Sequence, residues 1–207
     1  PKYITKEFWV YSDVLKIGFP SLCRQGLASI ATILLNNQAG SFGGDAALDA
    51  MSIVSKIFMI VFSASLGIGQ GYQPVCGYNY FAKRYDRVKE AMMFTLIWGA
   101  VLMFATCAIL FVFAKPIMTA FVSNGGEAIE IGTRVIRYQS IAMPFLSLNV
   151  IANMSFQSTK KKLSATLLSC CRQGIFFIPF IFILPSILNL GGVEMTQALS
   201  DFCTFLF

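Results

Sequence analysis

Long stretches without a charged residue dominate the pattern of hydrophobic and polar positions in this chain. Five runs contain no Asp, Glu, Lys or Arg, and they cover residues 25–44, 57–82, 91–114, 138–159 and 173–193. Each run is at least 20 residues long. Because a helix rises about 1.5 Å per residue, roughly 20 residues cross a hydrocarbon core about 30 Å thick. The pattern therefore predicts membrane-spanning helices.

The polar residues between these runs set the edges of six predicted spans. We expect the spans at about 14–38, 45–75, 89–114, 128–157, 163–185 and 191–207, within one transmembrane unit over residues 14–207. The sixth is expected to be cut short, because few residues follow Gly192 and they include Glu194 and Asp201. Residues 1–13 mix lysines with aromatic residues, which is typical of a membrane interface or of a linker from a preceding domain. Since the chain begins at Pro1 and not at Met, we expect a fragment of a larger membrane protein.

Composition supports the same class. Hydrophobic residues make up 56% of the chain and charged residues 13%, whereas a soluble domain carries about 25% charged residues. We therefore predict an all-α integral membrane protein, built as a six-transmembrane-helix bundle. The absence of His removes His-ligated metal sites and Ser-His-Asp triads, and no two acids have a spacing suited to acid–base catalysis. We expect neither an enzyme nor a metal site, and we interpret the six Cys as small buried hydrophobic residues.

Basic residues are concentrated in alternate connections between the spans. The loop at 79–89 contains Lys83, Arg84, Arg87 and Lys89, and the loop at 158–163 contains Lys160, Lys161 and Lys162, while the opposite connections are mostly acidic and rich in glycine. Lys and Arg gather on the cytoplasmic side of membrane proteins. Both basic loops are therefore predicted to be cytoplasmic in a multi-pass protein of the plasma membrane. The net charge of +6 then reflects topology, and no nucleic-acid partner is expected.

Charged side chains inside the predicted spans are functional candidates because charge is costly within a bilayer. Arg24, Lys56 and Arg172 each lie well inside a span. For Arg24 and Lys56 a functional and a structural role stay equally open. For Arg172 we favour a structural role, with a carboxylate or helix-end carbonyls as its partner. Glu130 and Arg134, four residues apart, are expected to form a local ion pair.

Polar side chains within the spans supply the candidate substrate-cavity residues. These are Gln25, Asn36, Lys56, Gln70, Asn149 and Asn153, and their expected role is polar contact with a substrate and hydration of its path. Asn149 and Asn153 share one helix face because they are four residues apart. That face either lines a water-filled cavity or forms hydrogen bonds to neighbouring helices.

Glycine and proline interrupt several spans. Residues 67–71 read GIGQG, but no strand precedes them, so a nucleotide-binding loop is disfavoured. The spacing of Gly67 and Gly71 instead predicts close helix packing. Pro20, Pro74, Pro144 and Pro179 are expected to bend their helices.

One segment has a specific sequence pattern. Residues 67–91 read GIGQGYQPVCGYNYFAKRYDRVKEA, and they closely resemble the second helix and following cytoplasmic loop in the C-terminal half of multidrug and toxin extrusion (MATE) transporters. The match rests on Gln73-Pro74, Gly77-Tyr78-Asn79 and Ala82-Lys83-Arg84-Tyr85. It extends to residues 16–21, Phe156-Gln157, and Arg172-Gln173-Gly174 with Pro179, and so covers essentially the whole chain.

The resemblance implies one lobe of a twelve-helix MATE-type transporter, with residues 1–13 as the segment that follows a missing N-terminal lobe. It also implies a secondary antiporter for multidrug efflux, which exports cationic or amphipathic organic compounds in exchange for protons or sodium ions. Such a transporter works by alternating access between two lobes. The expected partners are small organic cations or drug-like molecules, the coupling ion, the lipid bilayer and the N-terminal lobe. No cofactor is implied apart from the coupling ion.

The sequence departs from one branch of this family. Its sodium-coupled members have acidic residues on the seventh and tenth helices, whereas the corresponding stretches here, 21–35 and 141–153, contain none. We therefore expect the coupling site in the missing lobe. Two alternatives stay open. One is a lipid-linked sugar flippase of the same broad superfamily, which Arg24, Lys56 and Arg172 favour, and the other is a non-transporting membrane scaffold or half-protein.

Overall fold

The computed structural model describes residues 8–122 and 126–207, and the regular structure within these ranges is helical. The elements are α1 (Phe8–Phe81), α2 (Tyr85–Phe121), α3 (Gly126–Ser158), α4 (Lys162–Cys170), the π-helical turn η1 (Cys171–Ile175), α5 (Phe177–Leu188) and α6 (Leu190–Leu206). The prediction of an all-helical bundle is confirmed. Of the predicted lead-in at 1–13, residues 1–7 lie outside the described part, and α1 begins at Phe8.

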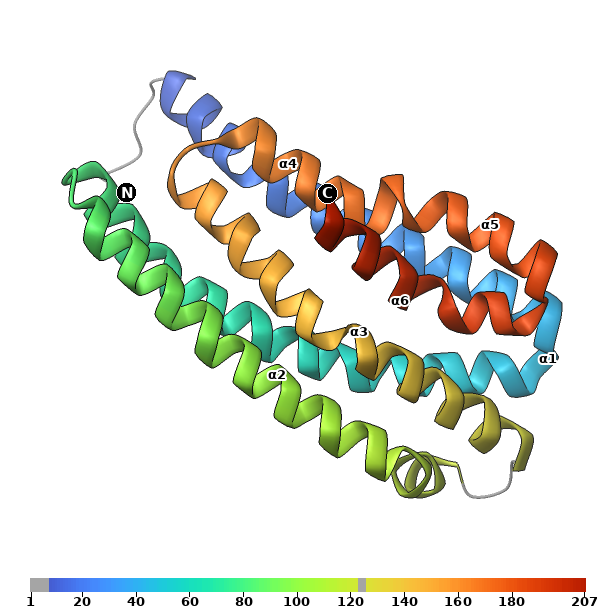
Figure 1. The fold of residues 1–207 in the computed structure, drawn as a ribbon. Helices are drawn as coiled ribbons and strands as arrows, with labels where there is room; N and C mark the ends of the chain where they lie inside the picture. The colour runs from blue at the N-terminus through green and yellow to red at the C-terminus, as the bar shows by residue number, and fades with distance from the viewer. Residues whose placement is uncertain (1–7, 123–125) are drawn as a thin grey trace, which may run out of the picture.

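Helix α1 consists of two halves that meet at Gly44, where the chain reverses direction (Figure 1). Gly44 has φ 61° and ψ −157°, a left-handed backbone conformation that glycine adopts without the strain imposed by a side chain. A single glycine thus replaces a loop. The predicted spans 14–38 and 45–75 lie in the two halves.

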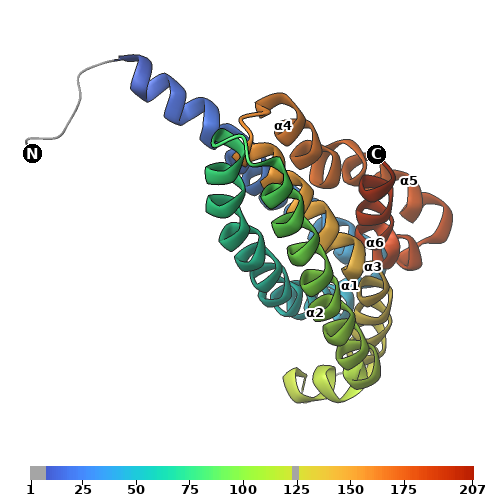
Figure 2. The same ribbon diagram turned by 60° about the vertical axis from the view of Figure 1, so that its left-hand side comes forward.

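Helix α3 runs through the centre of the bundle, with α2 and the second half of α1 on one side and α4, α5 and α6 on the other (Figures 1 and 2). Its most apolar stretch has a mean hydropathy of only 1.2, against 1.9 to 2.5 for the other long apolar helices, yet 61% of that stretch is buried. Polar side chains are stable within a membrane when protein and not lipid surrounds them. The central position of α3 therefore accounts for its polar sequence.

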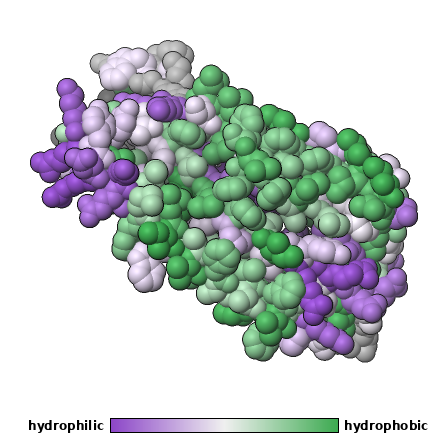
Figure 3. All heavy atoms as spheres, in the orientation of Figure 1, coloured by the Kyte–Doolittle hydropathy of each residue, from purple (hydrophilic) through white to green (hydrophobic). Residues whose placement is uncertain are grey.

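Four helical segments in the described residues are long and apolar enough to cross a membrane, judged by length and composition. They are Ser21–Phe81, Tyr85–Phe121, Gly126–Ser158 and Leu163–Leu188, and the first makes two passes because it bends at Gly44. Helix α6 is shorter, with 17 residues. Figure 3 shows a broad apolar band between two hydrophilic ends, as expected for a multi-pass membrane protein.

The interior of the bundle changes in character along its length. The apolar core occupies the half nearest the Gly44 bend, and its buried side chains include Met51, Met103, Met118, Ile136 and Phe177. Farther from the bend, buried apolar side chains such as Ile151 and Met154 are joined by hydrogen-bonded polar ones such as Asn149 and Asn153. The candidate site lies in that second half.

The two connections at the end opposite Gly44 share one backbone geometry. They contain Lys83, between α1 and α2, and Lys160, between α3 and α4, each with φ 58°. The next residue in each donates to a carbonyl five residues earlier, as Arg84 does to Asn79 at 2.9 Å and Lys161 does at 3.0 Å. This is the Schellman helix end, where glycine is the usual left-handed residue. A lysine in this left-handed conformation has a less favourable backbone energy than glycine, but its positive charge interacts favourably with the C-terminal end of the helix dipole.

Close packing in the second half of α1 depends on Gly69, so the predicted Gly67–Gly71 pair was wrong. A Cβ atom on Gly69 would lie 3.0 Å from Met154 Cγ and 3.2 Å from Val150 Cγ1, both on α3. A Cβ atom on Gly67 or Gly71 would meet nothing within 4 Å. The reason is helical rotation, since residues two positions from Gly69 point roughly 200° away from it.

The turn between α5 and α6 depends on Gly192. A Cβ atom there would overlap the backbone carbonyl of Leu184, whereas one on the adjacent Gly191 would meet nothing within 4 Å. The absence of a side chain at Gly192 lets α6 fold back directly against α5.

Candidate functional site

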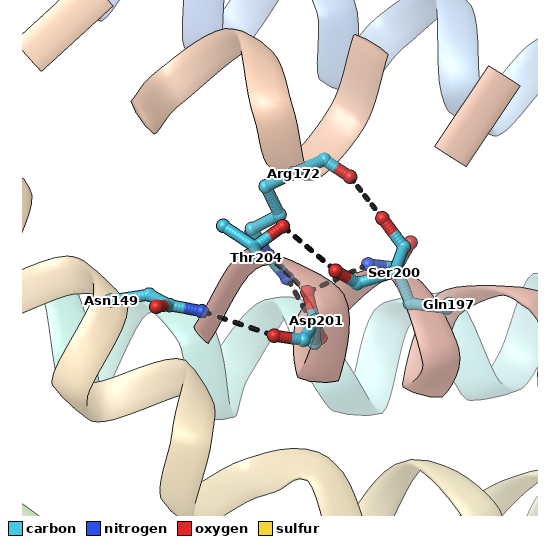
Figure 4. A network of polar contacts seen from close by, with 6 residues as sticks. All are labelled: Asn149, Arg172, Gln197, Ser200, Asp201 and Thr204. Atoms are coloured by element: carbon cyan, nitrogen blue, oxygen red, sulfur yellow. Dashed lines mark hydrogen bonds and ion pairs between the residues drawn. The ribbon is translucent and has the colours of Figure 1, made fainter. Parts of the chain in front are cut away.

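The polar interior is centred on an ion pair between η1 and α6 (Figure 4). Arg172 donates from Nε to Asp201 Oδ1 at 2.5 Å and from Nη2 to Oδ2 at 3.5 Å. The two side chains are only 17% and 7% exposed. Removing charges from water is unfavourable unless they are well paired, so each of these charges requires the other. The Phe62 ring of α1 lies 5.0 Å from the guanidinium carbon, which adds a cation–π contact.

The local sequence explains why the fifth span widens at this point. Pro179 has no backbone N–H, and a proline ring in a helix clashes with the carbonyl four residues earlier, here that of Ile175. The π-helical turn η1 ends at that residue, and such a turn shifts the backbone hydrogen-bond register. Ser200 Oγ donates to the carbonyl of Arg172 at 2.5 Å. Helix α6 therefore binds both the backbone and the side chain of Arg172.

Further polar side chains extend this network along α6. Gln197 Nε2 donates to Asp201 Oδ1 at 3.2 Å, and Thr204 Oγ1 donates to the Ser200 carbonyl at 2.7 Å. Asn149 Nδ2 of α3 donates to the backbone carbonyl of Asp201 at 3.2 Å. Gln197, Ser200 and Thr204 were not among the predicted candidates. Their spacing of three to four residues indicates one polar helix face, and this signal is present in the sequence.

A second network joins α3 to α4 and to the second half of α1. Asn153 Nδ2 donates to the Ala165 carbonyl at 2.8 Å and to Ser169 Oγ at 2.9 Å. Gln157 Nε2 donates to Asn153 Oδ1 at 2.6 Å, and Gln73 Nε2 donates to Gln157 Oε1 at 3.4 Å. These bonds satisfy polar groups that lipid could not satisfy.

The predicted cavity residues fall into separate groups. Asn149 and Asn153 are buried, and their amides bond to neighbouring helices, which is one of the two roles left open for them. Gln25, Lys56 and Gln70 are exposed on the surface of α1, outside the polar interior. The six residues therefore do not form one site within the bundle.

Arg24 and Asn36 are intermediate cases on the first half of α1. Both are half-buried, and Arg24 lies on the same helix face as the buried residues Ala31 and Leu35. The Arg24 Nε and Asn36 Oδ1 atoms are buried and have no hydrogen-bond partner among the described residues. A buried polar atom without a partner is costly, so both positions are suited to binding a further group.

Arg134 forms its ion pair with Glu194 on another helix, and not with Glu130 as predicted. Arg134 Nη2 lies 2.9 Å from Glu194 Oε1, and Arg134 Nε donates to the same carboxylate at 3.3 Å. Glu194 on α6 is only 2% exposed, whereas Arg134 on α3 is 50% exposed. A partly exposed arginine thus neutralises a buried acid. The two residues are 60 positions apart, so local spacing could not indicate this pair.

A pocket of about 480 Å³ lies beside the polar interior, between α2, α3, α4 and α6. Asn149, Ser164 and Thr204 contribute polar groups to an otherwise largely apolar lining that includes Leu96 and Phe205. Apolar walls with a few polar groups suit an amphipathic organic molecule. Within residues 8–122 and 126–207, no group of three or more His, Cys, Asp or Glu side chains could hold a metal ion.

Comparison with known proteins identifies the family. The family model described as MatE matches residues 20–183, which is most of the chain. The chain belongs to the MatE family. This MatE chain is accordingly a multi-pass membrane protein of a transporter family and not an enzyme. The resemblance described from its sequence is confirmed.

Two relatives of the MatE chain are distant in sequence. The multidrug export protein MepA of Staphylococcus haemolyticus (strain JCSC1435) is 21% identical over 195 residues, which cover 94% of this chain and 42% of that protein. MepA of Staphylococcus aureus (strain MSSA476) is 21% identical over 190 residues, covering 92% and 41%. The MatE chain thus spans less than half the length of these curated relatives.

Solved structures share the fold of the MatE chain at low sequence identity. A multidrug resistance MATE family transporter of the MOP superfamily, in an outward-facing conformation, has a TM-score of 0.89 at 19% identity, covering 99% of this chain and 46% of that one. A MOP superfamily transporter from Pyrococcus furiosus, described as having a binding pocket of reverse polarity, has a TM-score of 0.88 at 18% identity, covering 98% and 46%. The MatE chain therefore corresponds to one lobe of a MATE transporter fold.

Proposed function

We propose that this chain is the C-terminal lobe of a secondary antiporter in the plasma membrane. The antiporter exports cationic or amphipathic organic compounds in exchange for protons or sodium ions. It works by alternating access between this lobe and an N-terminal lobe of the same polypeptide. The relatives named MepA are multidrug export proteins, and the fold is that of MATE family transporters, which supports this assignment.

The observation that carries the proposal is the exposure of polar side chains inside apolar spans. Gln25, Lys56 and Gln70 are exposed on α1. Lys56 lies twelve residues beyond the Gly44 bend, which is about 18 Å along the helix. A lysine that faces lipid at the centre of a bilayer costs about 2.5 kcal/mol or more. A water-filled cavity against a second lobe removes that cost, so we infer that these side chains line the cavity.

We place the coupling-ion site in the other lobe. The stretches 21–35 and 141–153 contain no acid, and the Asp201 carboxylate is already paired with Arg172. The Arg172 guanidinium bonds to both oxygens of this carboxylate, so a coupling ion would have to displace the arginine. Asp201 is therefore better suited to a structural role than to ion coupling.

The proposed orientation places the basic loops 79–89 and 158–163 in the cytoplasm. Lys83, Arg84 and Lys160 are exposed at the same end of the bundle, where lysine and arginine favour the cytoplasmic side.

Transport in a host that lacks its own efflux pumps tests the proposal, with the lobe expressed in its full polypeptide. We expect resistance to cationic dyes and lower ethidium accumulation, both lost when the coupling gradient of protons or of sodium ions is dissipated. Gln25→Leu should lower ethidium efflux several-fold, whereas Thr119→Leu, on an exposed face of α2, should leave it unchanged. Resistance and accumulation equal to those of the empty host under both gradients would refute drug export.

A lipid-linked sugar flippase is the second candidate, and Arg24 is the observation that favours it. A guanidinium whose Nε is buried without a partner suits a pyrophosphate group. Loss of lipid-linked precursor transport in Arg24→Gln and Lys56→Gln, with ethidium efflux retained, would favour the flippase. A non-transporting half-protein predicts neither activity.

A further inference from the structure

A groove between the second half of α1 and α2 has a lining that changes from polar to apolar along its length. Its volume is about 660 Å³. Asn79, Arg87 and Glu90 line the end near the α1–α2 turn, and Ile68 and Trp98 line the far end. The two helices lie side by side along this length (Figure 1).

The two helices contribute to the groove at matching depths. Eleven residues separate Asn79 from Ile68 on α1, and eleven separate Arg87 from Trp98 on α2. Eleven residues of helix extend about 16 Å, which is close to the roughly 15 Å of hydrocarbon in one bilayer leaflet. The groove therefore has the length of one leaflet, with its polar end at the membrane surface.

The apolar half of the groove is open at a glycine. Gly71 lies in the lining, and a Cβ atom on it would meet nothing within 4 Å. Phe94 of α2 lies at the same depth and supplies an apolar wall. This shape suits a flexible hydrocarbon chain that follows the helices.

The mouth of the groove carries positive charge. Residues 83–90 contain four basic side chains and two acidic ones, a net charge of +2, and these side chains are exposed. Basic residues at a membrane surface attract anionic lipid headgroups. Among them, Arg87 and Glu90 line the groove itself, so the net positive charge comes from the residues around its mouth. The planar guanidinium of Arg87 is suited to binding a phosphate in a bidentate manner.

We propose that this groove binds one anionic phospholipid from the leaflet at the basic end of the bundle. Its phosphate is bound by Arg87 and Asn79, and one acyl chain passes Gly71 to reach Trp98. The positive mouth selects an anionic headgroup over a zwitterionic one. The inference does not depend on which compound the protein transports.

Native mass spectrometry of the purified protein tests the site. The protein in detergent is titrated with phosphatidylglycerol and, separately, with phosphatidylcholine of the same acyl chains. We expect one phosphatidylglycerol to bind about fivefold more tightly than phosphatidylcholine, as one additional favourable charge contact predicts. Arg87→Gln should abolish this preference, and Gly71→Leu should abolish binding of both lipids at this site by filling the groove.

Two matched variants serve as controls. Gly67→Leu places the same side chain in open space one helical turn away, and Lys115→Gln removes an exposed charge near the far end of α2. Both should bind phosphatidylglycerol as the wild type does. Equal binding of the two lipids by the wild type, or an unchanged preference in Arg87→Gln, would overturn the proposal, and Arg87→Gln decides the question if Gly71→Leu fails to fold. If Gly71→Leu abolishes ethidium binding but leaves phosphatidylglycerol binding unchanged, the groove is a drug site and the lipid proposal is also overturned.

Discussion

Replacing Asp201 with Asn should strongly destabilise this MatE-family lobe, because the change leaves the Arg172 guanidinium charged inside the bundle without a counter-ion. Asparagine keeps nearly the same shape and can still accept the hydrogen bond from Gln197. The change therefore isolates the loss of charge from any loss of packing.

The structure sets the expected magnitude. Removing one partner of a buried ion pair costs about 3–5 kcal/mol. Arg172 is 17% exposed and stacks over Phe62, so part of its stabilisation remains and we expect the lower end, about 3 kcal/mol. For a chain of 207 residues, that loss lowers the melting temperature by roughly 6–12 °C.

Thermal unfolding of the purified protein in detergent measures this change. Lys56→Gln is the matched control, since it removes a basic charge from an exposed position in a span, and it should change stability by less than about 0.5 kcal/mol. Arg172→Met combined with Asp201→Asn removes both charges and should recover at least half of the lost stability. The reasoning fails if Asp201→Asn shifts the melting temperature no more than Lys56→Gln does. It also fails if the double variant loses as much stability as the sum of the losses in the Asp201→Asn and Arg172→Met single variants.

Three further changes test backbone features. Gly192→Ala should unfold or severely destabilise the protein in thermal melts, because its Cβ atom would overlap backbone, while Gly191→Ala should be tolerated; equal melting temperatures would contradict this. Lys83→Gly should raise the free energy of unfolding by about 1 kcal/mol, because it removes left-handed backbone strain. Arg84→Gly, at a residue with φ −91°, should lower it. A lower free energy of unfolding in both variants would show that the strain is not released. Ser200→Ala should cost about 1–2 kcal/mol by leaving a buried carbonyl unpaired, and Ser200→Thr should restore most of it; a neutral alanine variant would mean that another donor reaches this carbonyl.

The membrane spans could be predicted from the sequence because the length of an apolar run is a local property. The helical nature of residues 57–82 or 91–114 depends on no distant contact. The packing of the same helices depends on rotation, which a run of apolar residues does not encode. The spacing of Gly67 and Gly71 therefore predicts a contact that Gly69 makes instead.

Individual residues of the candidate site could be predicted from the sequence, but the contacts between them could not. Arg172 and Asp201 are each recognisable as a charge inside a span, but their pairing depends on how η1 and α6 face each other across 29 positions. The same limit applies to Arg134, whose partner Glu194 comes from another helix and not from the preceding turn. Lys56 and Gln70 lie in apolar stretches, and no local pattern shows that the lobe leaves both of them exposed.

The change in the interior along the bundle has a dynamic consequence. The half near Gly44 is filled by close-packed side chains such as Met51 and Phe177, and a dense apolar core resists local opening. The other half also contains directional bonds such as those of Asn153 and Gln157, whose buried polar groups make its interior less uniformly apolar. Amide hydrogen exchange should therefore be slowest near the Gly44 bend and faster toward the basic end. A lobe with this gradient is rigid at one end and compliant at the other, so rocking against a partner would deform it mainly at its basic end.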